Sequence, residues 1–151
     1  MTTIEGRQAH FPQPPAMIFP IFSDLRNFAA NLPEDKKKDI VFDQDSIVGK
    51  VQGFELGVKI DERHPFSYIR LIEAGSTPIR FNIWLNFKPS DTGGTHFQIV
   101  AEIEMNMMIK MMVGNKLQDA VNQITDQLES VMNGKIPEGY EEYLKQMQGN
   151  K

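Results

Sequence analysis

Residues 79–88, IRFNIWLNFK, and residues 95–105, THFQIVAEIEM, form the stretch of sequence that decides the fold. In each segment apolar and polar side chains alternate strictly, which is typical of a strand with one buried face and one face in water. The residues between them include Asp91-Thr92-Gly93-Gly94, a composition typical of turns. Because the connection is short, the two segments are predicted to pair as an antiparallel hairpin.

A long amphipathic helix is predicted to follow this hairpin. Asn106 is a suitable N-cap, and Gly134 is predicted to end the helix. The apolar residues at helical spacing form one stripe: Val113, Leu117, Ala120, Val121, Ile124, Leu128 and Val131. This stripe is predicted to pack across the concave face of the sheet, because both elements need a partner to bury their apolar sides. The domain is predicted to cover residues 1–134, and residues 135–151 to form a polar tail.

The first half of the chain adds more strands and two short helices. Strands are predicted over residues 4–11, 39–44, 47–53, 54–63 and 66–74. A short helix is predicted over residues 15–22, with Pro15 suited to its first turn and Pro20 interrupting it. Asp24 is predicted to cap a second short helix over residues 25–31. The predicted fold class is therefore α+β, with a curved antiparallel sheet of about seven strands, two short helices after strand one and a long C-terminal helix.

The composition excludes several classes of function. The chain has 151 residues, a net charge of −4 and no cysteine, so disulfides, thiolate catalysis and cysteine metal sites are excluded. The one basic run, Lys36-Lys37-Lys38, is flanked by acids and is predicted to be a solvated loop, so no nucleic-acid partner is expected. No apolar run is long enough to span a membrane and no signal peptide is visible, so a cytoplasmic location is expected.

The remaining polar residues show no catalytic or metal-binding pattern. His10, His64 and His96 lack the spacing of metal ligands and are expected on the surface. Glu102 and Glu104 share one face of a strand and are expected to face water rather than an active-site pocket. We therefore expect neither a metal nor a cofactor.

Glycines and arginines in the predicted strands are assigned mainly structural roles. Gly49, Gly53 and Gly57 recur every four residues and are predicted to mark bends of the sheet. Arg70 and Arg80 are predicted to lie on the polar face. The alternative is that one of these arginines binds a ligand carboxylate at the mouth of a cavity.

Residues 19–28, FPIFSDLRNF, are similar to the first helix, capping aspartate and second helix of the START-like superfamily, also called SRPBCC. The order of predicted elements resembles the helix-grip fold of this superfamily over about residues 1–133. Its members include lipid-transfer domains, plant pollen-allergen-type proteins and polyketide cyclases, so the resemblance indicates the fold more than the function. It implies a cavity between the sheet and the long helix, often filled by an apolar ligand. Pro20 and the tail after Gly134 depart from the usual pattern.

Five of the nine methionines, Met105, Met107, Met108, Met111 and Met112, lie at the junction of the last strand and the long helix. Methionine is flexible and fills irregular apolar space. The cluster therefore indicates either an adaptable pocket or a solid core, and the sequence leaves both interpretations open.

The function predicted from these features is binding of a hydrophobic small molecule or lipid between the sheet and the C-terminal helix. The predicted lining residues supply shape and an apolar surface: Phe28, Leu32, Leu56, Val58, Ile60, Phe81, Ile83, Ile99, Ile103, Met105, Met108 and Met112. One alternative is a protein-interaction module that uses Trp84 and residues 140–147. A less favoured alternative is a cyclase- or hydrolase-type enzyme, because the predicted inner face lacks polar residues.

Overall fold

The structure of this chain, a computed structural model, describes residues 1–29, 34–51 and 53–134. The strands are β1 (Thr2–Glu5), β2 (Ala9–Phe11), β3 (Ile40–Phe42), β4 (Ser46–Val51), β5 (Phe54–His64), β6 (Tyr68–Glu73), β7 (Phe81–Pro89) and β8 (Thr95–Ile103). The helices are α1 (Pro15–Phe22), α2 (Arg26–Ala29), α3 (Glu34–Lys37) and α4 (Met107–Met132).

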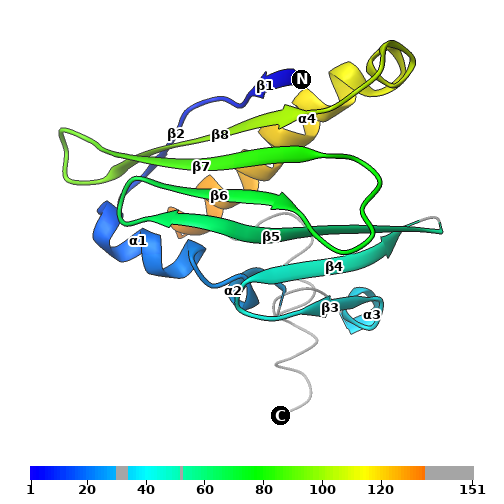
Figure 1. Cartoon of the computed structure of the whole chain (residues 1–151). Helices are drawn as coiled ribbons and strands as arrows, with labels where there is room; N and C mark the ends of the chain where they lie inside the picture. Colours follow the sequence, from blue (N-terminus) through cyan, green and yellow to red (C-terminus); the bar gives the residue numbers. More distant parts are fainter. Residues whose placement is uncertain (30–33, 52, 135–151) are drawn as a thin grey trace.

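The strands form a single antiparallel sheet in the order β1-β8-β7-β6-β5-β4-β3 (Figure 1). β2 continues along the same edge as β1 and pairs with another part of β8. The hairpin of β7 and β8 is confirmed, with Leu85 opposite Ile99 and Phe87 opposite Phe97. These four side chains are buried, so the alternation correctly identified the inner face.

The hydrophobic core lies between this inner face, β2 and α1. Its buried members are Ala9, Phe11, Ile18, Phe19, Phe22, Ile69, Leu71, Leu85, Phe87, Phe97 and Ile99. Phenylalanine rings dominate the centre, where Phe97 stacks on Phe11 with ring centroids 5.0 Å apart and on Phe22 at 5.4 Å. The predicted α+β helix-grip layout is confirmed.

The predicted first strand is divided into β1 and β2. Between them, Gly6 donates its N–H to the Ile99 carbonyl at 2.8 Å and passes very close to α4. A Cβ atom at Gly6 would lie only 2.8 Å from Cγ1 of Val121 and 3.0 Å from the Ile99 oxygen. Glycine is therefore required at this crossing.

The lysine run and the glycines of β4 and β5 also differ from expectation. Lys37 ends the short helix α3, so the prediction of a loop is wrong there; Glu34 begins that helix and pairs with Lys37 at 3.5 Å.

Gly49 and Gly57 lie where neighbouring strands approach closely, while Gly53 adopts a φ of 82° between β4 and β5. Two of the three glycines thus mark close approach and one marks the turn.

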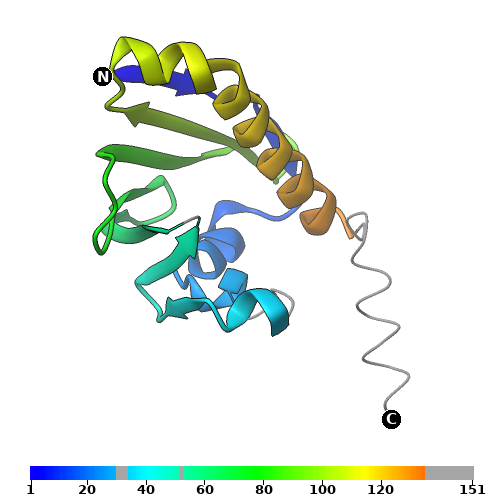
Figure 2. The ribbon, with the colours of Figure 1, turned by 90° about the vertical axis from the view of Figure 1, so that its right-hand side faces the viewer.

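Helix α4 packs mainly against β1, β2 and β8, on the side of the sheet seen in Figure 2. Val121 and Leu128 contact the core, and Thr125 is fully buried. The prediction that the whole apolar stripe is buried is wrong, because Ile124 is 50% exposed and Val131 is 52% exposed. Since α4 lies over one edge of the sheet, the side of the helix that carries these two residues remains open.

Candidate functional site

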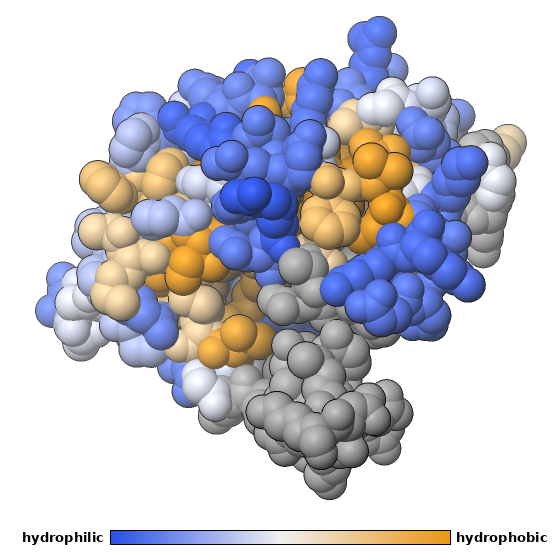
Figure 3. Space-filling view, turned by 90° about the horizontal axis from the view of Figure 1, so that it is seen from below, coloured by the Kyte–Doolittle hydropathy of each residue, from blue (hydrophilic) through white to orange (hydrophobic). Residues whose placement is uncertain are grey.

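An open apolar groove lies between α2, β4 and α4. It has a volume of about 480 Å³ and is lined by Phe28, Ala29, Ile47, Ile124, Gln127, Leu128 and Val131. The lining comes from a short helix, a strand and the C-terminal half of the long helix. Gln127 is the single polar side chain among these lining residues. On the underside of the molecule, apolar surface shows in patches between polar side chains (Figure 3).

The wall that carries Phe28 and Ala29 is held in place by local capping and by ring stacking. The Asp24 carboxylate accepts the N–H of Arg26 at 3.0 Å, which confirms the predicted cap of α2. The Phe28 ring stacks on Phe22 of the core with centroids 5.2 Å apart. The Leu25 N–H donates to the carbonyl of Gln44 at 2.9 Å, which joins the residue before this short helix to the turn between β3 and β4.

The opposite walls come from β4 and α4. Ile47 pairs with Val58 of β5 and Phe42 of β3, so it lies on the same side of the sheet as these residues. Ile124 and Val131 project from the open side of α4, whereas Leu128 lies between the groove and the core. The half-exposed apolar side chains of the groove are therefore available to an apolar guest without unfolding the core.

The predicted lining residues occupy several different places. Phe28 lines the groove, and Ile60, Ile83 and Ile99 belong to the core or pack against it. The predicted residues that are partly buried on β5, β7 and β8 or just after β8 are Val58, Phe81, Ile103 and Met105. Leu56 is 41% exposed, and Leu32 lies outside the described residues.

The methionines at the strand-to-helix junction lie mostly on the surface. Met108 is 71% exposed and Met112 is 68% exposed, and Met107 and Met111 are also exposed. The interpretation of the cluster as a solid core is wrong for these four side chains, and none of them is among the residues that line the groove. The sheet does not cover the first turns of α4, so helical spacing alone could not show whether they are buried.

Sequence reasoning missed most of the groove. It did not select Ala29, Ile47, Ile124, Gln127, Leu128 or Val131 as lining residues. The helical stripe contained Ile124, Leu128 and Val131, but it was interpreted as core. The stripe spans about 100° of an ideal helix, the ordinary width for a helix that faces a core, so its width gave no signal that part of it lines a groove.

Polar side chains do lie on the inner side of the sheet, contrary to the prediction, and they include Glu73 and the fully buried Thr95. Glu73 is opposite Val58 and, at a spacing of two residues, lies on the same face of β6 as Leu71 and Ile69. Its carboxylate accepts the N–H of Phe81 at 3.0 Å, and this hydrogen bond holds the pKa of Glu73 below its ordinary value. The carboxylate is therefore ionised near neutral pH and unsuited to act as a general acid.

A second cleft, of about 410 Å³, is polar and lies beside the C-terminal end of α4. Its Glu129 carboxylate accepts the N–H of His10 at 2.7 Å and a guanidinium N–H of Arg7 at 2.9 Å. Arg7 also donates to Asp126 at 2.7 Å, and the Asn133 amide donates to the His10 carbonyl at 3.2 Å. We call these five residues the polar clasp.

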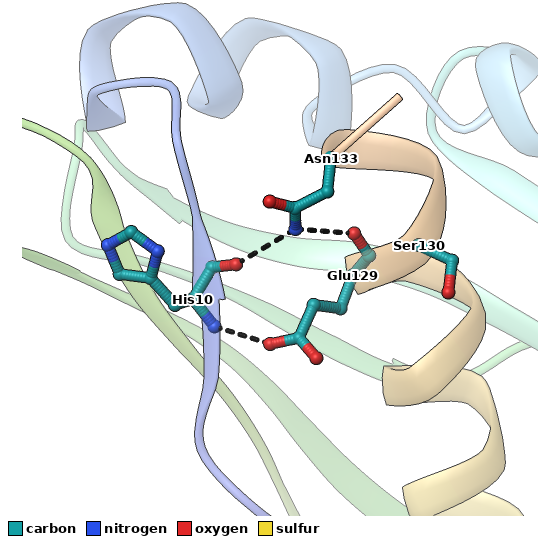
Figure 4. A pocket seen from close by; sticks show the side chains of 4 residues that line it. All are labelled: His10, Glu129, Ser130 and Asn133. Atoms are coloured by element: carbon teal, nitrogen blue, oxygen red, sulfur yellow. Dashed lines mark hydrogen bonds between the residues drawn. The ribbon is translucent and has the colours of Figure 1, made fainter. Parts of the chain in front are cut away.

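The polar clasp is structural in character. Figure 4 shows that the imidazole of His10 points away from Glu129, so the two side chains do not form an acid–base pair. The hydrogen bond from Arg7 lowers the pKa of Glu129 below its ordinary value of 4.5, against the opposing effect of burial. Both carboxylate oxygens accept hydrogen bonds, and these tie β2 and the segment between β1 and β2 to α4.

The outer face of the sheet has its own polar cluster. Arg70 forms an ion pair with Asp61, and its Nε lies 3.7 Å from Oε2 of Glu62. Arg70 therefore lies among acidic side chains on the outer, polar face of the sheet, as predicted. Trp84 lies opposite Arg70 and is half-buried. Arg80 is exposed and lies before β7.

The histidines are less scattered than the sequence indicated. His10 is directly opposite His96 in the sheet, and their ring centroids lie 5.6 Å apart. Within the described part of the chain, no group of three histidine or acidic side chains is arranged to hold a metal ion. Among the same residues, no helix is both long and apolar enough to cross a membrane.

No protein-family profile and no curated protein sequence matches the chain. Solved structures do match. The Mll3558 protein from Rhizobium loti has a TM-score of 0.58 at 13% identity, over 86% of this chain and 99% of that one. SA2116 from Staphylococcus aureus, described as a protein of unknown function, has a TM-score of 0.59 at 12% identity, over 87% of this chain and 90% of that one.

Two further structures carry more informative names. Ara h 8.0201 has a TM-score of 0.52 at 14% identity, over 89% of this chain and 99% of that one. The Aha1 dimer from Colwellia psychrerythraea has a TM-score of 0.52 at 13% identity, over 81% of this chain and 97% of that one. At such low identity these similarities show a shared helix-grip fold and do not transfer an activity.

Proposed function

We propose that this protein binds a hydrophobic small molecule or lipid in the groove between α2, β4 and α4. The observation that carries the proposal is the nearly all-apolar lining of this groove, with Ile124 and Val131 half-exposed at its wall. Its volume of about 480 Å³ falls within the range of roughly 300–1,000 Å³ typical of small-molecule sites. Covering these side chains with an apolar guest removes them from water, which favours binding.

We also propose membership of the START-like superfamily. The support is the helix-grip layout, the element order and the capped segment around Asp24, together with the similarity to solved structures of this fold. The wider ligand surface predicted from the sequence, including Val58, Phe81 and Ile103, remains part of the proposal as a continuation along the inner face of the sheet. The cytoplasmic location remains a prediction from the sequence.

Native mass spectrometry of freshly purified protein provides the first test. We expect an adduct that is released on denaturation and whose mass identifies an apolar molecule. After delipidation, an environment-sensitive apolar dye should bind at a single site. A clean unliganded mass together with no saturable dye binding would contradict the proposal and favour the protein-interaction module.

Variants locate the site. Ile124→Glu should weaken dye binding at least tenfold, because placing a charge in the groove opposes burial of an apolar guest. Val41→Glu is the matched control, since Val41 is an apolar side chain that is 78% exposed on β3 and does not line the groove. Equal loss of binding in both variants would place the dye elsewhere.

A further inference from the structure

The first turns of α4 form an exposed apolar tip. Met107 is 79% exposed and Met111 is 83% exposed, which leaves these long side chains almost wholly in water. Met108 and Met112 are exposed to a similar degree. Figure 1 shows these turns extending past the end of β8, away from the body of the sheet. We call these four methionines, together with Lys110 and Lys116, the methionine tip.

The methionine tip has the arrangement of a helix that lies in a membrane interface. At about 100° per residue on an ideal helix, its methionines cover an arc of about 140°. Lys110 lies about 60° beyond one end of the arc and Lys116 about 40° beyond the other. Both lysines are exposed. Methionines flanked by lysines suit insertion between lipid headgroups. The aliphatic part of each lysine side chain can lie along the apolar region while its amine stays in water.

The local charge is positive although the chain carries a net charge of −4. Residues 105–118 contain two lysines and no acidic residue. Glu104 borders this segment on one side, with its N–H bonded to the carbonyl of Arg80 at 2.9 Å, and Asp119 borders it on the other. The positive end of the α4 dipole lies at the same place. The positive charge of the methionine tip therefore complements an anionic surface.

We propose that the methionine tip docks the protein onto a lipid surface that contains anionic headgroups. A second copy of this chain is the less suitable occupant, because a symmetric contact through the same patch would bring the lysines of both copies together. The proposal goes beyond ligand binding in the groove, since the tip and the groove use different residues of α4.

Vesicle co-sedimentation of the full chain tests the docking. We expect binding to phosphatidylcholine vesicles that contain phosphatidylserine, weaker binding to pure phosphatidylcholine, and a decline as salt is added. Lys110→Gln combined with Lys116→Gln should weaken binding to the anionic vesicles about thirtyfold, since each lysine near such a surface contributes roughly fivefold. Met108→Ser combined with Met112→Ser should weaken binding to both kinds of vesicle.

Insertion of the tip can be observed directly because the chain has no native cysteine. An environment-sensitive fluorophore attached to the Met108→Cys variant should shift to the blue when anionic vesicles are added. The same fluorophore on the Val41→Cys variant, at another exposed apolar site, should not shift. A blue shift at both positions, or at neither, would overturn the assignment of the tip.

Two further results distinguish the proposals from each other. Ile124→Glu should lose dye binding and retain vesicle binding, so failure of the groove proposal leaves the docking test intact. Sedimentation velocity can also detect a dimer of the parent protein that is lost when Met108→Ser and Met112→Ser are combined. Such a dimer, without vesicle binding, would overturn membrane docking and make a second copy of the chain the partner of the methionine tip.

Discussion

The two halves of α4 differ sharply although they belong to one continuous helix. Met107 and Thr125 lie on the same side of an ideal helix, because five full turns separate them. Thr125 is fully buried, whereas Met107 is 79% exposed. The difference lies outside the helix: the crossing at Gly6 and the strand β2 support the C-terminal half and the polar clasp ties it down, while the first turns extend past the sheet.

This contrast shows that apolar periodicity describes what a helix can bury and not what it does bury. The stripe of the C-terminal half meets the core through Val121 and Leu128. The four methionines of the first turns, in contrast, are between 68% and 83% exposed. The exposed half is thus free to contact another molecule, and the supported half contributes to stability and to one wall of the groove.

Truncation of a core side chain beneath the supported half of α4 should have the largest effect on stability. Phe97 is fully buried and stacks on Phe11 and Phe22, so Phe97→Ala should destabilise the protein by about 3–5 kcal/mol. Urea unfolding followed by circular dichroism measures this cost. Phe97→Leu, which leaves a smaller cavity, should cost clearly less, and equal costs would show that the size of the cavity does not determine the loss of stability.

The next effect concerns the supported half of α4 itself. Leu128 is partly buried against the core, so Leu128→Ala should cost about 2 kcal/mol, at the low end for a leucine truncation. The same unfolding experiment applies. A cost below about 0.5 kcal/mol, a value typical of surface positions, would show that this half of the helix is no better supported than the exposed half.

The polar clasp should make a smaller, pH-dependent contribution to the free energy of unfolding. Glu129→Gln should cost about 1 kcal/mol at neutral pH, a modest value because the Glu129 side chain is 31% exposed. Since Arg7 lowers the pKa of Glu129 in the folded state, this stabilisation is present above the ordinary pKa of 4.5 and is lost as pH falls through the folded value.

The measurement for the clasp compares unfolding free energies of the parent and Glu129→Gln at neutral and acidic pH. The difference between the two proteins should shrink as pH falls below about 4.5. Asp119→Asn serves as the control, since Asp119 is an exposed acid on the same helix. A difference that is unchanged in acid would mean that the charge of Glu129 does not stabilise the helix.

Much of the fold could be predicted from the sequence, because each strand carries its own local signal. The strict alternation around Leu85 and Ile99 correctly identified the inner face, and Asp24 correctly marked the start of α2. The groove could not be predicted in the same way. Whether Ile124 faces the core or solvent depends on which edge of the sheet α4 covers, and that choice is made by distant contacts such as Gly6 against Val121.

The smallest effect on stability is expected at the methionine tip, and it is the most informative about the contrast within α4. Met111 is 83% exposed, so Met111→Ala should change the unfolding free energy by less than about 0.5 kcal/mol. Alanine also has a slightly better helix propensity than methionine, so the change has no local cost. If the same variant binds anionic vesicles more weakly while its stability is unchanged, the exposed methionine serves contact with a membrane and not the fold. A loss of more than about 2 kcal/mol would instead show that the first turns of α4 pack against the protein in solution, and the two halves of the helix would then be alike.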